Sequence, residues 1–210
     1  MKTESLFRSY ELLVDKADQA FQKTKALHGP SMACELHCSD CCHAVFGLFL
    51  IEAMSLKNRF DELDREKKKA ALLRCNETER GLKRLEKKLE RYEEDPEAQA
   101  LILARERIRC PLLDEENECV LYAHRPITCR VYGIPTKIQG AARVCGKAAF
   151  EKGISYPVFD LDGVYRNLYT LSRELLSEGG GKNPDKAAYL ISVPRAIGAS
   201  FDELIRETFE

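Results

Sequence analysis

Eight cysteines of this chain fall into two groups whose density is typical of a metal site. The first group lies within nine residues, and the second follows residues 43–109. The groups comprise Cys34, Cys38, Cys41 and Cys42, then Cys110, Cys119, Cys129 and Cys145. A hydrophobic core does not need sulfur at that density, whereas thiolates are strong ligands for zinc, copper(I) and iron–sulfur clusters. The sequence therefore predicts that all eight bind metal, at two four-ligand centres or at one larger cluster.

Cysteine spacing leaves the kind of metal open. Structural zinc sites usually contain paired Cys-x2-Cys knuckles, and only Cys38-x2-Cys41 has that spacing here. The gaps of eight, nine and fifteen residues between the later cysteines suit an iron–sulfur cluster at least as well. The predicted cofactor is thus an iron–sulfur cluster, with the 4Fe-4S type favoured, or zinc.

The first group also constrains its own geometry. If Ala33–His43 is helical, Cys34, Cys38 and Cys41 lie one above another on one face. Adjacent Cys41 and Cys42 would then point about 100° apart, so they would serve two centres, or one of them would not touch metal. The triplet also has the spacing of radical S-adenosylmethionine enzymes, but the βαβα alternation of their barrel is not visible here.

Arginines crowd the cysteines at four positions: Arg109, Arg125, Arg130 and Arg143. Four thiolates around Zn²⁺, or around a cubane in its 2+ state, leave a net charge of −2, which guanidinium groups would compensate. We predict that Arg125 and Arg130 contact the cofactor. The alternative role of these arginines is ion pairing with the acidic turn at residues 114–116.

Other polar residues near the cysteines are not predicted as metal ligands. His37, His43 and His124 are expected beside the metal or at the surface, because thiolates already suffice as ligands. Glu52 is expected to hydrogen-bond a ligand-bearing loop or Arg130, with an exposed carboxylate as the alternative. No thiol stands out as a nucleophile, so no catalytic residue is assigned.

Apolar periodicity predicts a mostly α-helical chain of one domain, residues 1–210, with an irregular lobe organised by metal. Helices are expected over residues 3–27, ended by His28-Gly29-Pro30, and over Gly47–Leu63 and Leu161–Leu176. A break at Gly179–Gly181, a short helix from Pro184 and a last helix capped by Ser200 should follow. Residues 119–122 could form a short strand.

Residues 57–109 are dominated by Lys, Arg, Glu and Leu, and Cys75 lies alone among them. Apolar residues recur as a seam of Leu82, Leu85, Leu89 and Tyr92, and a new helix should begin near Pro96. We interpret this segment as a coiled-coil-like helical hairpin inserted between the two cysteine groups. Its solvated face could instead bind a protein partner.

Composition limits the class of protein. The 210 residues are 44% hydrophobic and carry a net charge of −1, which argues against broad electrostatic binding of nucleic acid. The first residues lack the apolar centre of a secretory signal, and the run Ala44–Ile51 is too short to span a membrane. We expect a cytoplasmic protein whose cysteines stay reduced, since a disulfide framework would need a secreted chain.

The ordered motifs resemble a known family. Cys34-x3-Cys38-x2-Cys41-Cys42 and Cys110-Pro-Leu-Leu are followed by a longer run and by Cys145. That run is Cys119-x-Leu-Tyr-x-x-Arg125-Pro126-x-x-Cys129-Arg130. Over roughly residues 30–150 the pattern is similar to the YkgJ-like cysteine-cluster family, also described as the CxxCxxCC zinc- or iron-chelating domain. The first gap is x3 here, whereas the family name quotes x2.

The resemblance implies metal or iron–sulfur binding through the eight cysteines, with a structural or electron-transfer role. Some relatives are labelled flagellin lysine N-methylases, but those chains are longer. The alternative function is therefore a cluster-dependent methyltransferase that uses S-adenosylmethionine. Both functions remain open from the sequence.

Overall fold

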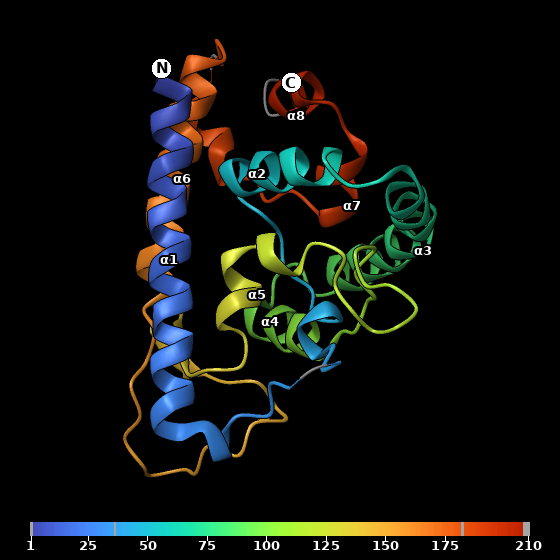
Figure 1. Cartoon of the computed structure of the whole chain (residues 1–210). Helices are drawn as coiled ribbons and strands as arrows, with labels where there is room; N and C mark the ends of the chain where they lie inside the picture. Colours follow the sequence, from blue (N-terminus) through green and yellow to red (C-terminus); the bar gives the residue numbers. More distant parts are fainter. Residues whose placement is uncertain (1, 36, 182, 208–210) are drawn as a thin grey trace.

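The computed structural model describes residues 2–35, 37–181 and 183–207, and it is mostly helical, as predicted (Figure 1). Its α-helices are α1 Lys2–His28, α2 Leu50–Asp61, α3 Arg65–Glu90, α4 Pro96–Arg105, α5 Ile127–Val131, α6 Leu161–Glu178, α7 Val193–Gly198 and α8 Phe201–Glu207. Short 3-10 turns cover η1 Gly29–Ser31, η2 Asp40–Cys42, η3 Tyr122–His124 and η4 Pro184–Ala188. Strands β1 Thr136–Ile138 and β2 Ala141–Arg143 pair antiparallel. Among these described helices, none is both long and apolar enough to cross a membrane.

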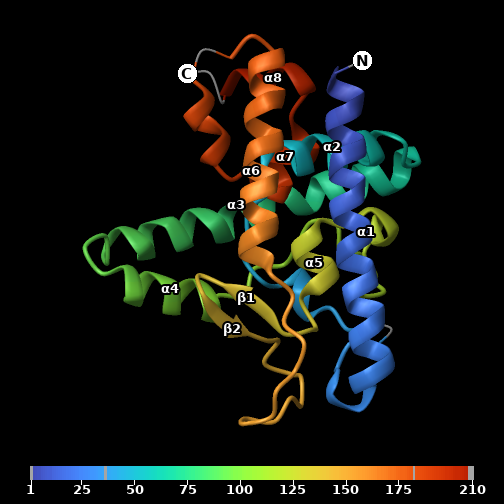
Figure 2. The ribbon, with the colours of Figure 1, turned by 90° about the vertical axis from the view of Figure 1, so that its left-hand side faces the viewer.

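Two long core helices, α1 and α6, lie side by side in both ribbon views (Figures 1 and 2). They run antiparallel, since Thr3 Oγ1 at the start of α1 donates to Glu178 Oε2 at the end of α6, at 2.8 Å. Each buries an apolar stripe with helical spacing. The stripes comprise Leu6, Tyr10, Leu13 and Ala17 on α1 and Leu161, Val164, Leu168 and Leu175 on α6. The predicted ends of these helices, at Gly29-Pro30 and Gly179, are confirmed.

Helix α2 joins two apolar clusters, because residues on several of its faces are buried. Leu50, Ile51 and Met54 pack with α1 and α6. Ala53, Leu56 and Phe60 pack with α3, α7 and the loop at residues 112–121. This central helix therefore couples the long helical pair to the part of the chain that carries the second cysteine group.

The predicted start of α2 at Gly47 is wrong by three residues. Leu48 is extended and exchanges two backbone hydrogen bonds of 2.8 Å with Ile191. The chains approach so closely there that a Cβ at Gly47 would clash with Leu190 Cβ. The helix begins only after this bridge, at Leu50.

Glu52 is a buried carboxylate in the first turn of α2, with 2% of its surface exposed. Its oxygens accept from the backbone N–H of Phe49, at 3.4 Å, and of Ile127, at 3.1 Å. Ile127 begins α5, which carries Cys129, so the expected bond to a ligand-bearing segment is confirmed, while Arg130 is not its partner. Burial raises the pKa of Glu52 to about 7, although the two N–H donors oppose the shift.

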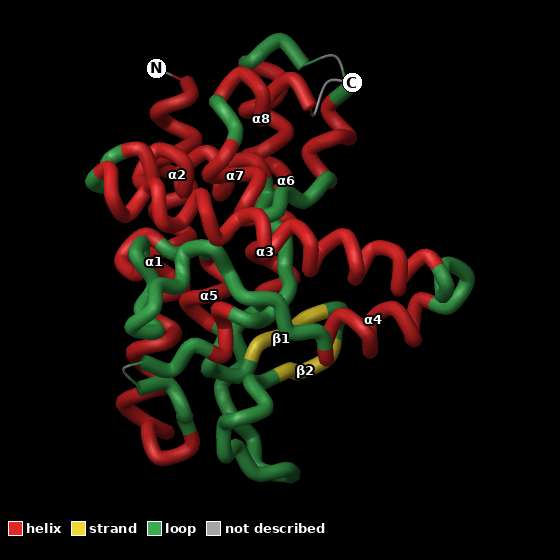
Figure 3. Tube along the Cα trace, turned by 90° about the vertical axis from the view of Figure 1, so that its right-hand side faces the viewer, coloured by secondary structure: helices red, strands yellow, loops and turns green. Residues whose placement is uncertain are grey.

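The charged segment forms the expected helical hairpin of α3 and α4, and its two ends differ. Ala71 and Cys75 of α3 belong to the apolar cluster around α2 and α7. Leu85, further along α3, is also buried but lies outside that cluster. The far end of α3 and all of α4 project from the body (Figure 3). Across the hairpin, Nζ of Lys88, near the end of α3, lies 3.1 Å from Oε2 of Glu106, which directly follows α4. The buried residues of α3 thus extend as far as Leu85, and the hairpin projects beyond it.

Some local predictions are wrong. The short strand at residues 119–122 is absent, because after a bridge at Cys119 the chain turns into η3. The short helix predicted from Pro184 is present and is of the 3-10 type (η4), whereas α7 and the β1–β2 sheet were not anticipated. The cap of the last helix is confirmed, since Ser200 Oγ accepts from the N–H of Glu203 at 3.2 Å and Ser200 N–H donates to its carboxylate.

Replacing residues 89–105 with a short glycine–serine turn should leave the fold intact. The new turn would connect Lys88 to Glu106, whose side chains already form an ion pair. The deletion removes no residue of either apolar cluster. We expect the thermal midpoint to change by only a few degrees, equivalent to about 1 kcal/mol or less. Loss of cooperative unfolding by circular dichroism would contradict this assignment.

Glu52→Gln should flatten the pH dependence of stability. The carboxyl has a folded pKa of about 7 and a model-peptide value of 4.5, so the free energy of unfolding should fall as pH rises between them. The difference corresponds to ~3 kcal/mol. Urea unfolding of metal-free, reduced protein from pH 4 to 8 checks this. Equal slopes for variant and wild type would show that burial does not hold the carboxyl neutral.

Candidate metal centre

Backbone pairing brings the two cysteine groups together. The N–H of Cys110 donates to the carbonyl of Cys42 at 2.7 Å, and the N–H of Ile108 donates to that of His43 at 3.0 Å. Ala44 and Arg107 continue the antiparallel contact. Residues 42–44 and 107–110 therefore lie against each other although the whole helical hairpin separates them in sequence.

Helix α3 fixes the second of these segments from the other side. Thr78 Oγ1 donates to the carbonyl of Arg109 at 2.8 Å, and Arg74 Nε donates to that of Pro111 at 2.9 Å. Both carbonyls flank Cys110, so its backbone is held on either side. The position of this cysteine thus depends on the core part of α3.

The first cysteine group is not the helix that the sequence allowed. The N–H of Cys38 closes a turn on the carbonyl of Glu35, and only Asp40–Cys42 form a 3-10 turn. His37 has a φ of 64°, a left-handed conformation that an α-helix cannot contain. The thiols of Cys41 and Cys42 lie close enough to shift each other's pKa, so the expected divergence of these thiols does not hold.

A tight loop places Cys110 and Cys119 near each other. Leu113 bridges to Cys119, and the N–H of Val120 donates to the carbonyl of Leu112 at 2.9 Å. Within the loop, Asp114 Oδ1 accepts from two backbone N–H groups, at 2.7 and 3.1 Å. The acidic turn predicted from the sequence thus reverses the chain direction and brings residues 119–120 back beside residues 112–113.

The last two cysteines approach the first group from separate segments. Cys129 lies in α5, and Cys145 follows β2. Cys145 Sγ donates to Asp40 Oδ2 at 3.4 Å and accepts from the N–H of Lys147 at 3.5 Å. Cys34 lies so close to Gly133 that a Cβ at this glycine would clash with the Cys34 sulfur.

All eight predicted ligands line two adjoining cavities. The larger, of about 430 Å³, is bordered by Cys34, Cys38, Cys41, Cys42, Cys119, Cys129 and Cys145. The smaller, of about 60 Å³, is bordered by Cys41, Cys42, Cys110, Cys119 and Cys129. Cys75 lines neither, because it is buried in the core face of α3. All nine cysteines are free thiols.

The thiols line the same cavities, but they are not arranged as a coordination shell around one point. Among the described residues, no group of three or more Cys, His, Asp or Glu side chains is close enough to grip one ion. Coordination would therefore require rotation of cysteine side chains toward a common point. The donor set itself fits a thiophilic metal, since most of the side chains around both cavities that could ligate a metal are thiols.

Arg125 is a cationic residue whose side chain lies among these thiols. It lines both cavities, and its guanidinium carbon lies 3.8 Å above the centre of the Tyr122 ring. Among the residues that the structure describes, its buried Nε has no hydrogen-bond partner, and the same holds for Nε of Arg109. Such an orphaned donor fits a site built for an anionic sulfur that is brought by a cofactor or formed on metal binding.

The other arginines have different surroundings. Arg130 is buried and donates to Asp18 Oδ2 at 2.6 Å and to the carbonyls of Arg125 and Ala123 at 2.8 and 2.6 Å. A cofactor contact by Arg130, as predicted, would compete with these three bonds. Arg109 holds the acidic turn through the Asp114 carbonyl, at 2.6 Å. Arg143 lies on the exposed strand β2.

Burial and mutual repulsion make the thiolates costly. Burial raises the pKa of Cys34 to about 11 and that of Cys110 to about 12, and it also raises that of Cys129. Neighbouring cysteines raise all three further, whereas Arg125 lowers the pKa of Cys34 and Cys129. The hydrogen bond within the Cys41–Cys42 pair lowers the pKa of Cys41 and raises that of Cys42. A cation would be needed to stabilise several thiolates here together.

Of the three histidines named from the sequence, His37 borders the larger cavity, whereas His43 and His124 border neither cavity. His37 is exposed, and its Nδ1 contacts the carbonyl of Glu116 at 3.2 Å. His43 Nδ1 lies 3.0 Å from the carbonyl of Ser39. Sequence reasoning missed Asp40 and Tyr132, which border the larger cavity. For Asp40 the only available signal was its place directly before Cys41.

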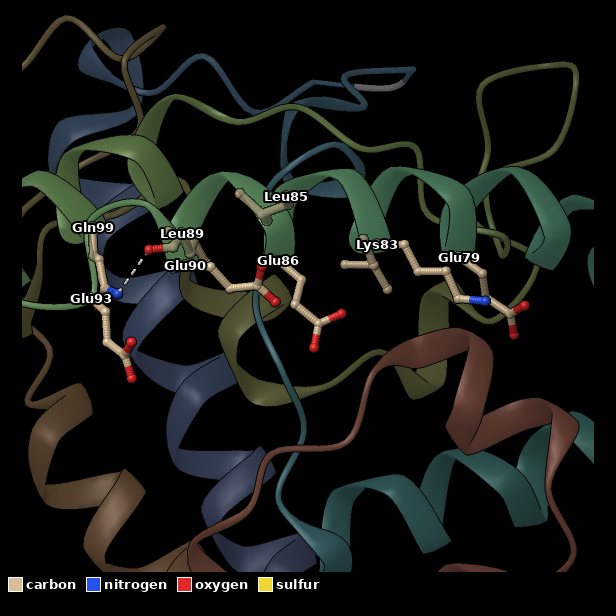
Figure 4. Close-up of a pocket in the computed structure, with 9 residues that line it drawn as sticks. Glu79, Lys83, Leu85, Glu86, Leu89, Glu90, Glu93 and Gln99 are labelled. Carbon is tan, nitrogen blue, oxygen red and sulfur yellow. Dashed lines mark hydrogen bonds between the residues drawn. The ribbon is translucent and has the colours of Figure 1, made fainter.

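A separate groove of about 560 Å³ runs along the projecting hairpin (Figure 4). Figure 4 shows the carboxylates of Glu79, Glu86, Glu90 and Glu93 along it. Gln99 of α4 closes one end by donating to the carbonyl of Leu89 at 3.3 Å. No thiol borders this groove, so it is separate from the cysteine cavities.

Comparison with known families matches residues 33–146 to the family described as "CxxCxxCC: Putative zinc- or iron-chelating domain". Comparison with curated proteins and with solved structures found no match. The matched segment is 114 of the 210 residues and contains every cysteine that lines the two cavities. The chain therefore belongs to the CxxCxxCC family of zinc- or iron-chelating domains.

Proposed function

We propose that this chain is a metal-binding protein that holds an iron–sulfur cluster or zinc through its eight clustered cysteines. The observation that carries the proposal is the convergence of eight thiols, from four segments of the chain, on two adjoining cavities. The bound group would supply the positive charge that the thiolates lack. A structural or redox role follows from this, in a reducing compartment such as the cytoplasm.

Arg125 supports an anionic metal–sulfur centre. Four thiolates leave a net charge of −2 on either Zn²⁺ or a 2+ cubane, and Arg125 is placed to offset part of it. Its free Nε–H can donate to a ligand thiolate, or to an inorganic sulfide if the centre is a cluster. The chain's own residues thus bind, shield and electrostatically balance the centre.

An enzyme is the second candidate, favoured by the size of the larger cavity. Its 430 Å³ lies beside the cysteines and is bordered by Phe21, Tyr122 and Tyr132, which could pack against an organic ligand. A methyltransferase using S-adenosylmethionine would need such a space. Calorimetric titration of anaerobic protein with S-adenosylmethionine tests it, and an absence of binding would leave the metal-binding function alone.

Anaerobic purification should yield protein with bound iron and sulfide, or with bound zinc, in amounts stoichiometric with the chain. Elemental analysis distinguishes the metals, and a brown colour accompanies a cluster. Cys129→Ser should lower the metal content by at least half. Cys75→Ser is the matched control and should leave it unchanged, because this thiol borders neither cavity. Wild-type protein that never binds either metal would refute the proposal.

Arg125→Gln should weaken metal binding about tenfold while the fold persists. The change removes a cation that lowers the pKa of Cys129 and a buried N–H donor without a partner among the described residues. Arg143→Gln is the control, since it removes an exposed arginine on β2. Competition with a chromophoric chelator measures the affinities. Equal metal affinity in the two variants would show that Arg125 does not stabilise the metal centre and only packs on the Tyr122 ring.

A further inference from the structure

The groove along the projecting hairpin is not used by the proposed metal-binding function. Apart from Gln99 of α4, the residues that border it belong to α3 or to the turn that follows α3. They are spaced mostly three or four residues apart, so they lie on one side of the helix (Figure 4). Leu82 and Leu89 border the groove and remain partly exposed, whereas Leu85 between them is buried. The groove thus presents apolar surface that the fold does not fully cover.

Charge is sorted between the two sides of this part of α3. Residues 79–93 contain four glutamates and six basic residues. All four glutamates border the groove, whereas Lys83 is the only one of the six basic residues that does. The four are exposed, and none forms an ion pair with a basic side chain among the described residues. A basic segment therefore has an acidic groove face.

The groove residues follow the heptad pattern of a coiled coil, in which apolar a and d positions form the contact and charged e and g positions beside it select the partner helix. With Leu82 and Leu89 at a and Leu85 at d, the e positions are Glu79, Glu86 and Glu93. Helix α4 has ten residues against 26 in α3, and it contributes only Gln99 to the groove. The acidic side of this seam is therefore open to a further helix.

The combination of glutamates and leucines decides between classes of occupant. Nucleic acids and anionic membrane surfaces are repelled by the glutamates. A second copy of this chain offers a basic stripe on α3 outside the groove, at Arg80, Arg84, Lys87 and Arg91. The leucines of residues 79–93 all border the groove instead, so that stripe has none to cover the partly exposed pair. A helix of another protein that carries both cations and apolar residues matches both features.

We propose that the groove on α3 docks an amphipathic helix of another protein, one whose apolar stripe is flanked by Lys and Arg. The partner's apolar residues pack on Leu82 and Leu89, and its cations pair with the glutamates at the e positions. The face from Glu79 to Glu93 is roughly 20 Å long at the rise of a helix, enough for a partner of about two to three heptads. The inference goes beyond metal binding and does not depend on it, because no thiol borders the groove.

Binding of synthetic peptides to the wild-type chain tests the chemistry of the groove. The probe is a fluorescein-labelled peptide of three heptads with Leu at a and d and Lys at e and g. One control peptide has Glu in place of every Lys, and a second has the composition of the probe in scrambled order. Fluorescence anisotropy at an ionic strength of about 0.15 M should show the probe binding at least tenfold more tightly than either control. This comparison needs no protein variant, so it does not depend on any variant folding.

Charge reversal on α3 locates the binding site. Glu86→Lys should weaken binding of the probe at least fivefold and strengthen binding of the Glu peptide. Glu77→Lys is the matched control, since Glu77 is also exposed on α3 but does not border the groove. The two variants change the net charge equally, so a difference between them reports the groove and not overall attraction. Leu89→Ala should also weaken binding of the probe at least fivefold.

Several outcomes would overturn the docking proposal. Equal binding of the probe and either control peptide would do so, as would equal loss of affinity in Glu86→Lys and Glu77→Lys. Sedimentation of the chain alone is a further test, because a dimer that Glu86→Lys dissociates would assign the groove to a second copy. Wild-type protein that binds the probe but never binds metal would refute the metal-binding function and leave docking intact.

Discussion

The antiparallel contact between residues 42–44 and 107–110 is the interaction on which the cysteine lobe depends. It consists of few backbone hydrogen bonds, and it is reinforced by side chains of α3 that bind the carbonyls of Arg109 and Pro111. The helical hairpin makes this contact possible, because an antiparallel pair of helices returns the chain close to where it left. The charged segment between the cysteine groups is thus part of how the groups meet, at least in its first turns.

Helices with a clear apolar period could be predicted from the sequence almost to the residue. Helices α1 and α6 each bury one face against a long partner, so local spacing and the glycines at their ends carry enough information. The extended stretch at Gly47 and Leu48 could not be predicted in this way. Its conformation depends on Leu190 and Ile191, which lie far along the chain and leave no local pattern.

The candidate site shows the same limit. The residue type and close spacing of the eight cysteines identified them as candidate ligands. The sequence could not tell which of Arg125 and Arg130 is available to a cofactor, since both lie beside the same ligands. Tertiary contacts separate them: Arg130 is bound by Asp18 of α1, while Arg125 keeps a buried donor without a partner among the thiols. Asp40 was missed because its role comes from Cys145, which lies 105 residues away.

Charge explains why such a lobe needs a cation. Each buried thiol is stable when protonated, and each thiolate would raise the pKa of its neighbours, so the cluster resists ionisation by itself. A single guanidinium cannot offset several thiolates. A metal ion can, and in binding it releases the thiol protons and ties four separate segments to one point. The free energy of metal binding would then act directly on a region with little regular structure, whereas the α1–α6 pair is held by its own apolar contact. Stability of the cysteine lobe should therefore follow the metal, and stability of the helical pair should not.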